Sequence, residues 1–176
     1  MRRRTTMLAL TAVSMIVGGG LVATAPAGAA EPAWNGRYSL ERSAASKTGT
    51  SLAARQGEPD FSDTYTFTSM CLGGTCSAVV TGGPAPKNAT LPQPPVYTWN
   101  GTSWVHVYDW QWDCYMGEGV EKVYAPAHSE AYYTPQPDGT FTGTWTTTIT
   151  GGPCNGDVTM NVAAYPVAPA AAPFGS

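Results

Sequence analysis

Polar and apolar residues alternate along much of the chain, with the period of two that is typical of β-strands with one buried face. The clearest run covers residues 103–113, and its even positions are occupied by Trp104, His106, Tyr108, Trp110 and Trp112. Its odd positions are occupied by Val105, Val107, Asp109, Gln111 and Asp113. Because a strand sends alternate side chains to opposite faces, we expect the aromatic face to be buried and the other face to be half polar.

Shorter alternating runs occur at residues 34–41, 64–69, 76–80, 140–149 and 157–164. Asn100-Gly101 separates two aromatic segments, and both residues tolerate the positive φ angles of a tight hairpin turn. Pro137-Asp138-Gly139 predicts another turn of this kind. These signals connect strands that are neighbours in the sequence, which favours an antiparallel meander.

Three segments lack the alternation and are expected to be loops: residues 47–60 with one helical turn at 52–55, residues 82–95, and a short connector at 125–129. The remaining segments give about seven or eight short strands. The sequence therefore predicts an all-β fold, a disulfide-stapled antiparallel meander that closes into a small barrel. A β-sandwich is the alternative.

The first 30 residues have the three-part pattern of a secretory signal peptide. Residues 2–4 are all arginine, residues 7–23 carry no charge, and small residues at 27–30 form cleavage sites. We expect cleavage after Ala30, a single β-domain over residues 31–166 and a flexible Pro/Ala-rich tail over 167–176. The mature protein would then have no transmembrane span and would be secreted or located in the cell envelope.

The charge balance disfavours nucleic acids and anionic lipid surfaces as partners. Without residues 1–30 the chain has six basic and twelve acidic residues, a net charge of −6. Nucleic acids and anionic lipid surfaces are bound by clustered Lys and Arg, and no such cluster follows the signal peptide. We therefore expect no nucleic-acid partner.

Four cysteines in an exported chain predict disulfide bonds. Cys71 and Cys76 flank a turn with two glycines, which allows them to come within disulfide range. Cys114 ends the aromatic face and Cys154 has the parity of the inward face of the last strand, so we expect them to pair across the core. The alternative is a metal site formed by Cys71, Cys76, Cys114 and His106, although this cysteine spacing is not that of common zinc sites. No cofactor is expected.

The candidate functional residues fall into two groups. Motifs for a serine nucleophile, a zinc protease or a phosphate-binding loop are absent from the sequence. The candidate acids of a glycan hydrolase are Asp109, Asp113, Glu118 and Glu121, because paired carboxylates cleave glycosidic bonds. The candidate ligand-facing aromatic residues are Trp104, Tyr108, Trp110, Trp112 and Trp145. A wet barrel exterior and a packed core are the simpler interpretations of these two groups.

Six short motifs follow one another in a fixed order. They are Trp34-Asn35-Gly36-Arg37-Tyr38, residues 66–71, 74–78, 97–104 and 138–145, and Cys154-Asn155-Gly156-Asp157-Val158. In this order, and with these cysteine positions, they resemble a group of small exported actinobacterial β-rich proteins of unknown function, best represented in mycobacteria. The resemblance covers most of residues 34–166 and implies secretion or location in the cell envelope. It implies no activity.

These observations leave two hypotheses. The first is a non-enzymatic secreted or cell-envelope β-domain that binds a small apolar molecule, a glycan or a protein. The alternative is a glycan-active hydrolase that uses paired carboxylates. A cavity lined by Trp and Tyr would favour a ligand-binding domain, an exposed apolar patch would favour protein contact, and a cleft with two converging carboxylates would favour the enzyme.

Overall fold

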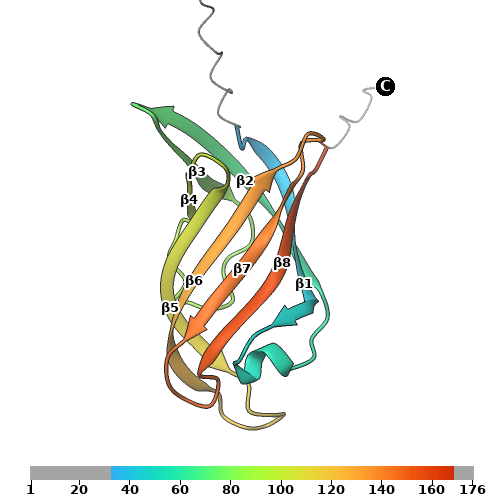
Figure 1. Cartoon of the computed structure of the whole chain (residues 1–176), viewed down its shortest axis with the longest axis vertical. Helices are drawn as coiled ribbons and strands as arrows, with labels where there is room; N and C mark the ends of the chain where they lie inside the picture. Colours follow the sequence, from blue (N-terminus) through green and yellow to red (C-terminus); the bar gives the residue numbers. More distant parts are fainter. Residues whose placement is uncertain (1–32, 169–176) are drawn as a thin grey trace, which may run out of the picture. The chain divides into compact units, whose positions relative to one another are not determined.

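The computed structural model describes residues 33–168, so the predicted signal peptide and residues 169–176 of the predicted tail lie outside the described part (Figure 1). One 3-10 helix, η1 (Leu52–Arg55), follows the first strand, as the sequence predicts. The strands are β1 (Gly36–Thr48), β2 (Phe61–Leu72), β3 (Thr75–Gly82), β4 (Val96–Trp99), β5 (Trp104–Cys114), β6 (Val123–Pro135), β7 (Phe141–Ile149) and β8 (Gly156–Pro166).

Each strand pairs with the next one in the sequence, and β8 pairs with β1 to close the barrel. All of these pairings are antiparallel, and the β1–β8 register places Leu40 opposite Ala164. Strands β5 to β8 are seen side by side in Figure 1. The predicted all-β meander that closes into a small barrel is therefore confirmed, and the sandwich alternative is wrong.

The predicted connector at residues 125–129 is wrong, because these residues belong to β6. Their inward side chains are small and lie opposite the large aromatic residues of β5: Trp112 pairs with Ala125, and Trp110 with Ala127. An eight-stranded barrel is only just wide enough for its interior side chains. The alanines of β6 thus leave room for the large aromatic side chains of β5. Because alanine has a low β-propensity, the sequence of this segment does not indicate a strand.

An aromatic cluster fills one part of the barrel interior. We call it the Trp34 cluster, and its largest members are Trp34, Phe67, Tyr97, Trp104, Tyr133 and Phe141. The Trp34 ring is fully buried and stacks on Phe67 at 4.2 Å and on Phe141 at 4.6 Å between centroids. Trp34 precedes β1, and its backbone N–H donates to Ser69 Oγ at 3.0 Å. The residue just before the first strand is therefore an integral part of the core.

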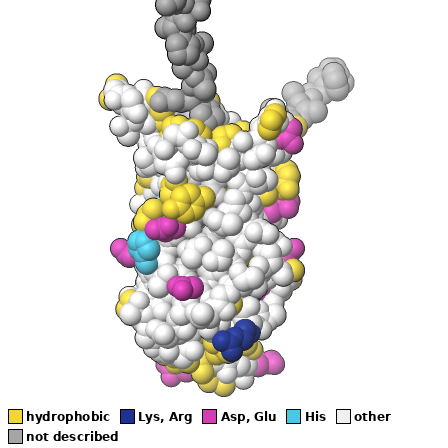
Figure 2. Space-filling model, viewed as in Figure 1, with side chains coloured by type: hydrophobic (Ala, Val, Ile, Leu, Met, Phe, Trp, Pro, Cys, Tyr) yellow, Lys and Arg dark blue, Asp and Glu magenta, His cyan; other side chains and the backbone are white. Residues whose placement is uncertain are grey.

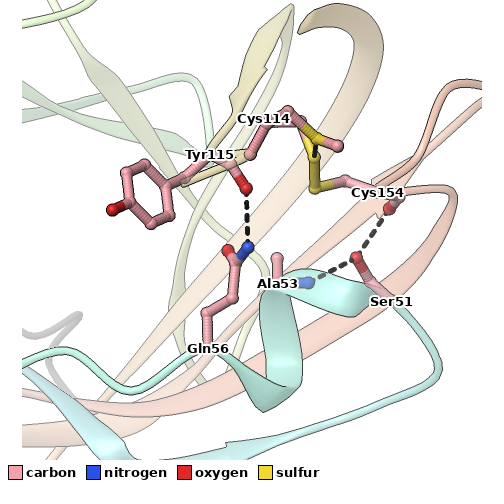
Figure 3. The surroundings of a disulfide bond; sticks show 7 residues. Ser51, Ala53, Gln56, Cys114, Tyr115 and Cys154 are labelled. Carbon is pink, nitrogen blue, oxygen red and sulfur yellow. Dashed lines mark hydrogen bonds between the residues drawn. A yellow bond between two sulfur atoms is a disulfide. The ribbon is translucent and has the colours of Figure 1, made fainter. Parts of the chain in front are cut away.

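A second cluster packs against η1 and contains Ala53, Cys114, Ala125, Ala127, Ile149, Cys154 and Val158. Figure 3 shows how Ser51 joins these elements: its hydroxyl donates to the Cys154 carbonyl at 2.6 Å and accepts from the Ala53 N–H at 3.1 Å. Gln56 donates to the Tyr115 carbonyl at 2.7 Å. These contacts attach η1 to the ends of β5 and of the β7–β8 turn.

The structure has both disulfide bonds that the sequence predicts. Cys71–Cys76 joins β2 to β3 across their hairpin, with 4.0 Å between the Cα atoms. Cys114–Cys154 spans 5.8 Å between Cα atoms. Since all four cysteines are in disulfides, the alternative metal site at Cys71, Cys76, Cys114 and His106 is wrong. Within residues 33–168, no helix is long and apolar enough to cross a membrane.

Candidate ligand-binding cavity

A cavity of about 600 Å³ lies inside the barrel, beside the Trp34 cluster. Leu40 and Tyr97 belong to both the cluster and the cavity wall. The rest of the wall comes from β1, β2, β3, β5, β7 and the segment between β3 and β4. The barrel interior is therefore filled in one part and open in the next.

Arg42 is the charged residue that β1 directs into the cavity. It lies on the same face of β1 as Leu40 and Ala44, which are both buried, so its side chain points inward. The side chain is only 15% exposed. Its guanidinium carbon lies 5.3 Å from the centroid of the Phe61 ring and 5.7 Å from that of the Trp145 ring. Cations are attracted to aromatic faces within about 6 Å, so these two rings stabilise and orient the guanidinium.

The ion pair of Arg42 is incomplete. Its Nη1 atom lies 3.8 Å from Oδ2 of Asp63 and is buried without a hydrogen-bond partner. The Asp63 side chain is 40% exposed, so water screens its attraction for the guanidinium. The guanidinium also interacts with the Tyr65 hydroxyl, but its Nη1 atom has no hydrogen-bond partner in the described part of the chain.

Aromatic residues on the inner face of β5 continue the wall. The His106 ring lies 4.9 Å from Tyr97 and 4.4 Å from Tyr108 between centroids. Burial lowers the pKa of His106, although its hydrogen bond to the Val96 carbonyl opposes this shift, so the imidazole is neutral near pH 7. Burial also raises the pKa of Tyr108 to about 12, which keeps its hydroxyl protonated.

Trp145 contributes both a ring and a polar atom to the cavity. Its indole Nε1 is buried and has no hydrogen-bond partner of ordinary geometry. It interacts with the Tyr108 hydroxyl, which opposes the rise in the pKa of that hydroxyl. Trp145 lies on β7 and shares the inward face of this strand with Gly143 and Thr147. The cavity therefore contains a second buried N–H group without an acceptor.

The segment of residues 83–95, which we call the strap, forms the remaining wall. Strand β4 is only four residues long and pairs with β5 at two positions, so most of that edge of β5 has no strand beside it. The strap occupies part of this edge: Asn88 donates to the Gln111 carbonyl at 2.8 Å, and the Gln111 N–H donates to Thr90 Oγ1 at 3.0 Å. Gly83 starts the strap at φ +147°, where an added Cβ would lie 2.4 Å from Tyr65.

The candidate aromatic residues occupy three different environments. Tyr108 and Trp145 line the cavity, whereas Trp104 is fully buried in the Trp34 cluster. Trp110 and Trp112 are half-buried and pack against the cluster beside η1, and Trp110 Nε1 donates to Ser129 Oγ at 2.8 Å. The aromatic face does point inward as predicted, but it is not uniformly buried.

The structure does not bring Asp109 and Asp113 together. Asp109 and Asp113 lie on the outer face of β5, four residues apart, which is about 13 Å along a strand. Carboxyl pairs of glycosidases lie about 5–9.5 Å apart. Asp109 contacts His128 Nδ1 at 2.7 Å, and Asp113 pairs with Lys122. Glu118 and Glu121 are exposed in the loop after β5.

Acidic side chains are scattered over the face shown in Figure 2, and Lys or Arg side chains are few. His128 is exposed, and its hydrogen bond to Asp109 raises its pKa; burial opposes this shift, and the charge of Asp109 and the nearby Glu130 add to it. These contacts place the His128 imidazole between the carboxylates of Asp109 and Glu130.

Sequence reasoning missed Arg42, Phe61 and Asp63. The signal for Arg42 is present, because it continues the inward series Tyr38, Leu40, Arg42 beyond the part of β1 whose alternation is clear. Charged side chains are usually found on the outer face of a strand, so the sequence alone does not indicate that Arg42 points inward. The closed barrel shows that its inward position faces a cavity.

The fold and cavity define a small disulfide-bonded, eight-stranded antiparallel barrel with an interior pocket. The chain belongs to the family of PknI serine/threonine-protein kinase sensor domains, whose model matches residues 31–172. This family membership agrees with the mycobacterial-type β-rich group that the sequence resembles.

One solved structure shows the same fold at low identity. The monomer form of the Mycobacterium tuberculosis PknI sensor domain has a TM-score of 0.57 and 15% identity, and the match covers 78% of this chain and 90% of that chain. The dimer form of that domain has a TM-score of 0.49 and 19% identity, covering 67% of this chain and 78% of that chain. No curated protein matches this chain.

Proposed function

We propose that this protein is an extracytoplasmic, non-enzymatic sensor-type domain that binds a small molecule in the cavity beside Arg42. The observation that carries the proposal is the cavity itself. Pockets of about 300–1,000 Å³ with apolar walls and a few polar groups are typical of small-molecule sites, and eight-stranded barrels can hold one small ligand. The cavity of about 600 Å³ meets both descriptions.

Three further features support this proposal. The family is named for the sensor domain of a kinase, a part that is distinct from the catalytic domain. Two disulfides and the signal-peptide pattern are typical of an exported chain. The separated carboxylates of β5 give no support to the hydrolase alternative.

The experiment that tests the proposal is binding of N-phenyl-1-naphthylamine, a neutral apolar probe whose fluorescence rises in apolar sites. We expect saturable binding to the exported protein. Val80 lines the cavity, so Val80→Trp should fill it and abolish the signal. Val107→Trp is the matched control, because Val107 lies on the exposed outer face of β5. Equal binding by the two variants would reject the cavity as the binding site.

A further inference from the structure

We infer that the cavity recognises an organic anion, with an acidic group bound by Arg42 and an apolar or aromatic body against Trp145 and Tyr108. This inference rests on the proposed function, since it names the ligand class of the same cavity. It adds that charge, and not only apolar contact, selects the ligand.

The first argument is an excess of buried donors. Arg42 Nη1 and Trp145 Nε1 are both buried, both line the cavity and both lack a hydrogen-bond partner. Buried polar groups in proteins are nearly always hydrogen-bonded, and a donor without an acceptor destabilises the fold. The other such donors in the described residues are the indole Nε1 atoms of Trp34, Trp104 and Trp112, which lie outside the cavity wall. Arg42 Nη1 is the charged donor of the set and lies where a ligand can reach it, so an acceptor on a bound ligand would stabilise it most.

The second argument is the charge of the cavity wall. The charged residues of the wall are Arg42, Asp63 and Lys87 of the strap, which give a net positive charge. Asp63 is 40% exposed and stands 3.8 Å from the guanidinium, so it does not fully neutralise Arg42. The chain after residue 30 has a net charge of −6, so the cavity has the opposite sign to the rest of the protein.

The third argument is geometry. Phe61 and Trp145 both lie within 6 Å of the guanidinium carbon, so the side chain is oriented before a ligand arrives. A planar guanidinium offers paired N–H donors that match the oxygens of a carboxylate, sulfonate or phosphate. The aromatic wall of His106 and Tyr108 provides a surface for the ligand body.

A matched pair of probes tests this inference. 8-Anilinonaphthalene-1-sulfonate carries a sulfonate that N-phenyl-1-naphthylamine lacks, and the two share the same rings. In Arg42→Gln we expect the sulfonate probe to bind about tenfold more weakly, as for the loss of a hydrogen bond to a charged group, while the neutral probe keeps its affinity. Arg37→Gln is the control, because Arg37 lies on the exposed outer face of the same strand, and it should change neither affinity.

The second variant guards against a fold defect at Arg42. Trp145→Phe keeps an aromatic ring beside the guanidinium but removes the N–H donor and part of the apolar wall, so it should weaken the sulfonate probe several-fold and the neutral probe less. Near-ultraviolet circular dichroism checks that both variants keep the native packing. Equal affinity of wild type, Arg42→Gln and Trp145→Phe for the sulfonate probe would overturn the inference, and would mean that water satisfies the two donors.

The failure of the inference is distinguishable from that of the proposed function. Binding of the neutral probe without any effect of Arg42→Gln on the anionic probe would leave the cavity a ligand site and refute the charge selection. If neither probe binds, both the proposed function and the inference about charge are refuted. Displacement of the sulfonate probe by decanoate but not by decanol supports a free acid, whereas displacement only by phosphatidylglycerol vesicles supports an anionic lipid headgroup as the source of the same chemistry.

Discussion

Two neighbouring parts of the barrel interior, the Trp34 cluster and the Arg42 cavity, are built from one strand pattern and have opposite properties. Trp104 and Tyr108 are four residues apart on the same face of β5, yet Trp104 is fully buried and Tyr108 lines an open space. The difference lies in what stands across the barrel. Trp34 and Phe67 fill the space near Trp104, whereas Arg42 projects near Tyr108. Alternation thus determines which way a side chain points, and the residues opposite determine whether it is packed.

The strongest way to break this comparison is to truncate the residue that fills the first part. Trp34→Ala removes a fully buried ring that stacks on two others, and should lower the free energy of unfolding by about 3–5 kcal/mol. Urea unfolding followed by fluorescence measures this change. The counterpart in the second part is Arg42→Met, which replaces an incompletely paired charge by an apolar chain and should change the stability by less than about 1 kcal/mol. Similar losses in the two variants would contradict a filled and an open part.

The two disulfides extend the comparison to regions outside the cavity. Cys114–Cys154 closes 40 residues of sequence and Cys71–Cys76 closes five. In the chain-entropy model, removal of the first by a double Cys→Ala substitution should cost about 4 kcal/mol and removal of the second about 2 kcal/mol. Thermal unfolding of the two variants measures the order. The reverse order would show that the hairpin of β2 and β3 carries more of the stability than its short loop predicts.

The smallest expected effect concerns the two histidines, one on each side of the barrel wall. The pKa of His128 should lie above its usual value of about 6.5 and return towards it in Asp109→Asn, while the pKa of His106 should lie below that value in both proteins. Nuclear magnetic resonance titration of the ring protons measures both. A pKa of His106 at or above that of His128 would contradict the placement of His106 in the interior.

The signs of the two contributions to stability are opposite. For His128 the folded pKa is raised, so its contribution is present below the unfolded pKa and is lost as the pH rises through the folded pKa. For His106 the folded pKa is lowered, so stability falls as the pH decreases through the unfolded pKa and towards the folded one. Since His128 is largely exposed, its effect is screened and small.

Most of the fold could be predicted from the sequence because alternation and turn residues are local signals. The run at residues 103–113 predicts β5, and Asn100-Gly101 predicts the turn before it. The beginning of β6 could not be predicted in this way. Ala125 and Ala127 form a strand because the large rings of β5 need small neighbours, which is a property of the packed barrel.

The candidate site was less predictable, for a physical reason. Tyr108 and Trp145 could be named as candidates, but their separation from Trp104 depends on side chains that lie far apart in the sequence. Arg42 belongs to β1 and Trp145 to β7, and the guanidinium reaches that ring only because the barrel closes. The proline-rich sequence of the strap likewise predicts only a loop. It does not indicate that this loop covers the gap beside the four-residue strand β4.

The pairing of β1 with β8 has a consequence for the order of folding. Leu40 and Ala164 are opposite each other in the closed barrel and more than 120 residues apart in the chain. Hairpins from β2 to β7 can form from local contacts as the chain lengthens, but the closing pair requires the last strand and the ordering of nearly the whole domain. Until β8 arrives, β1 and β7 are open sheet edges that can pair with another chain. The vulnerable period of this protein is therefore the interval between the appearance of its first strand and that of its last.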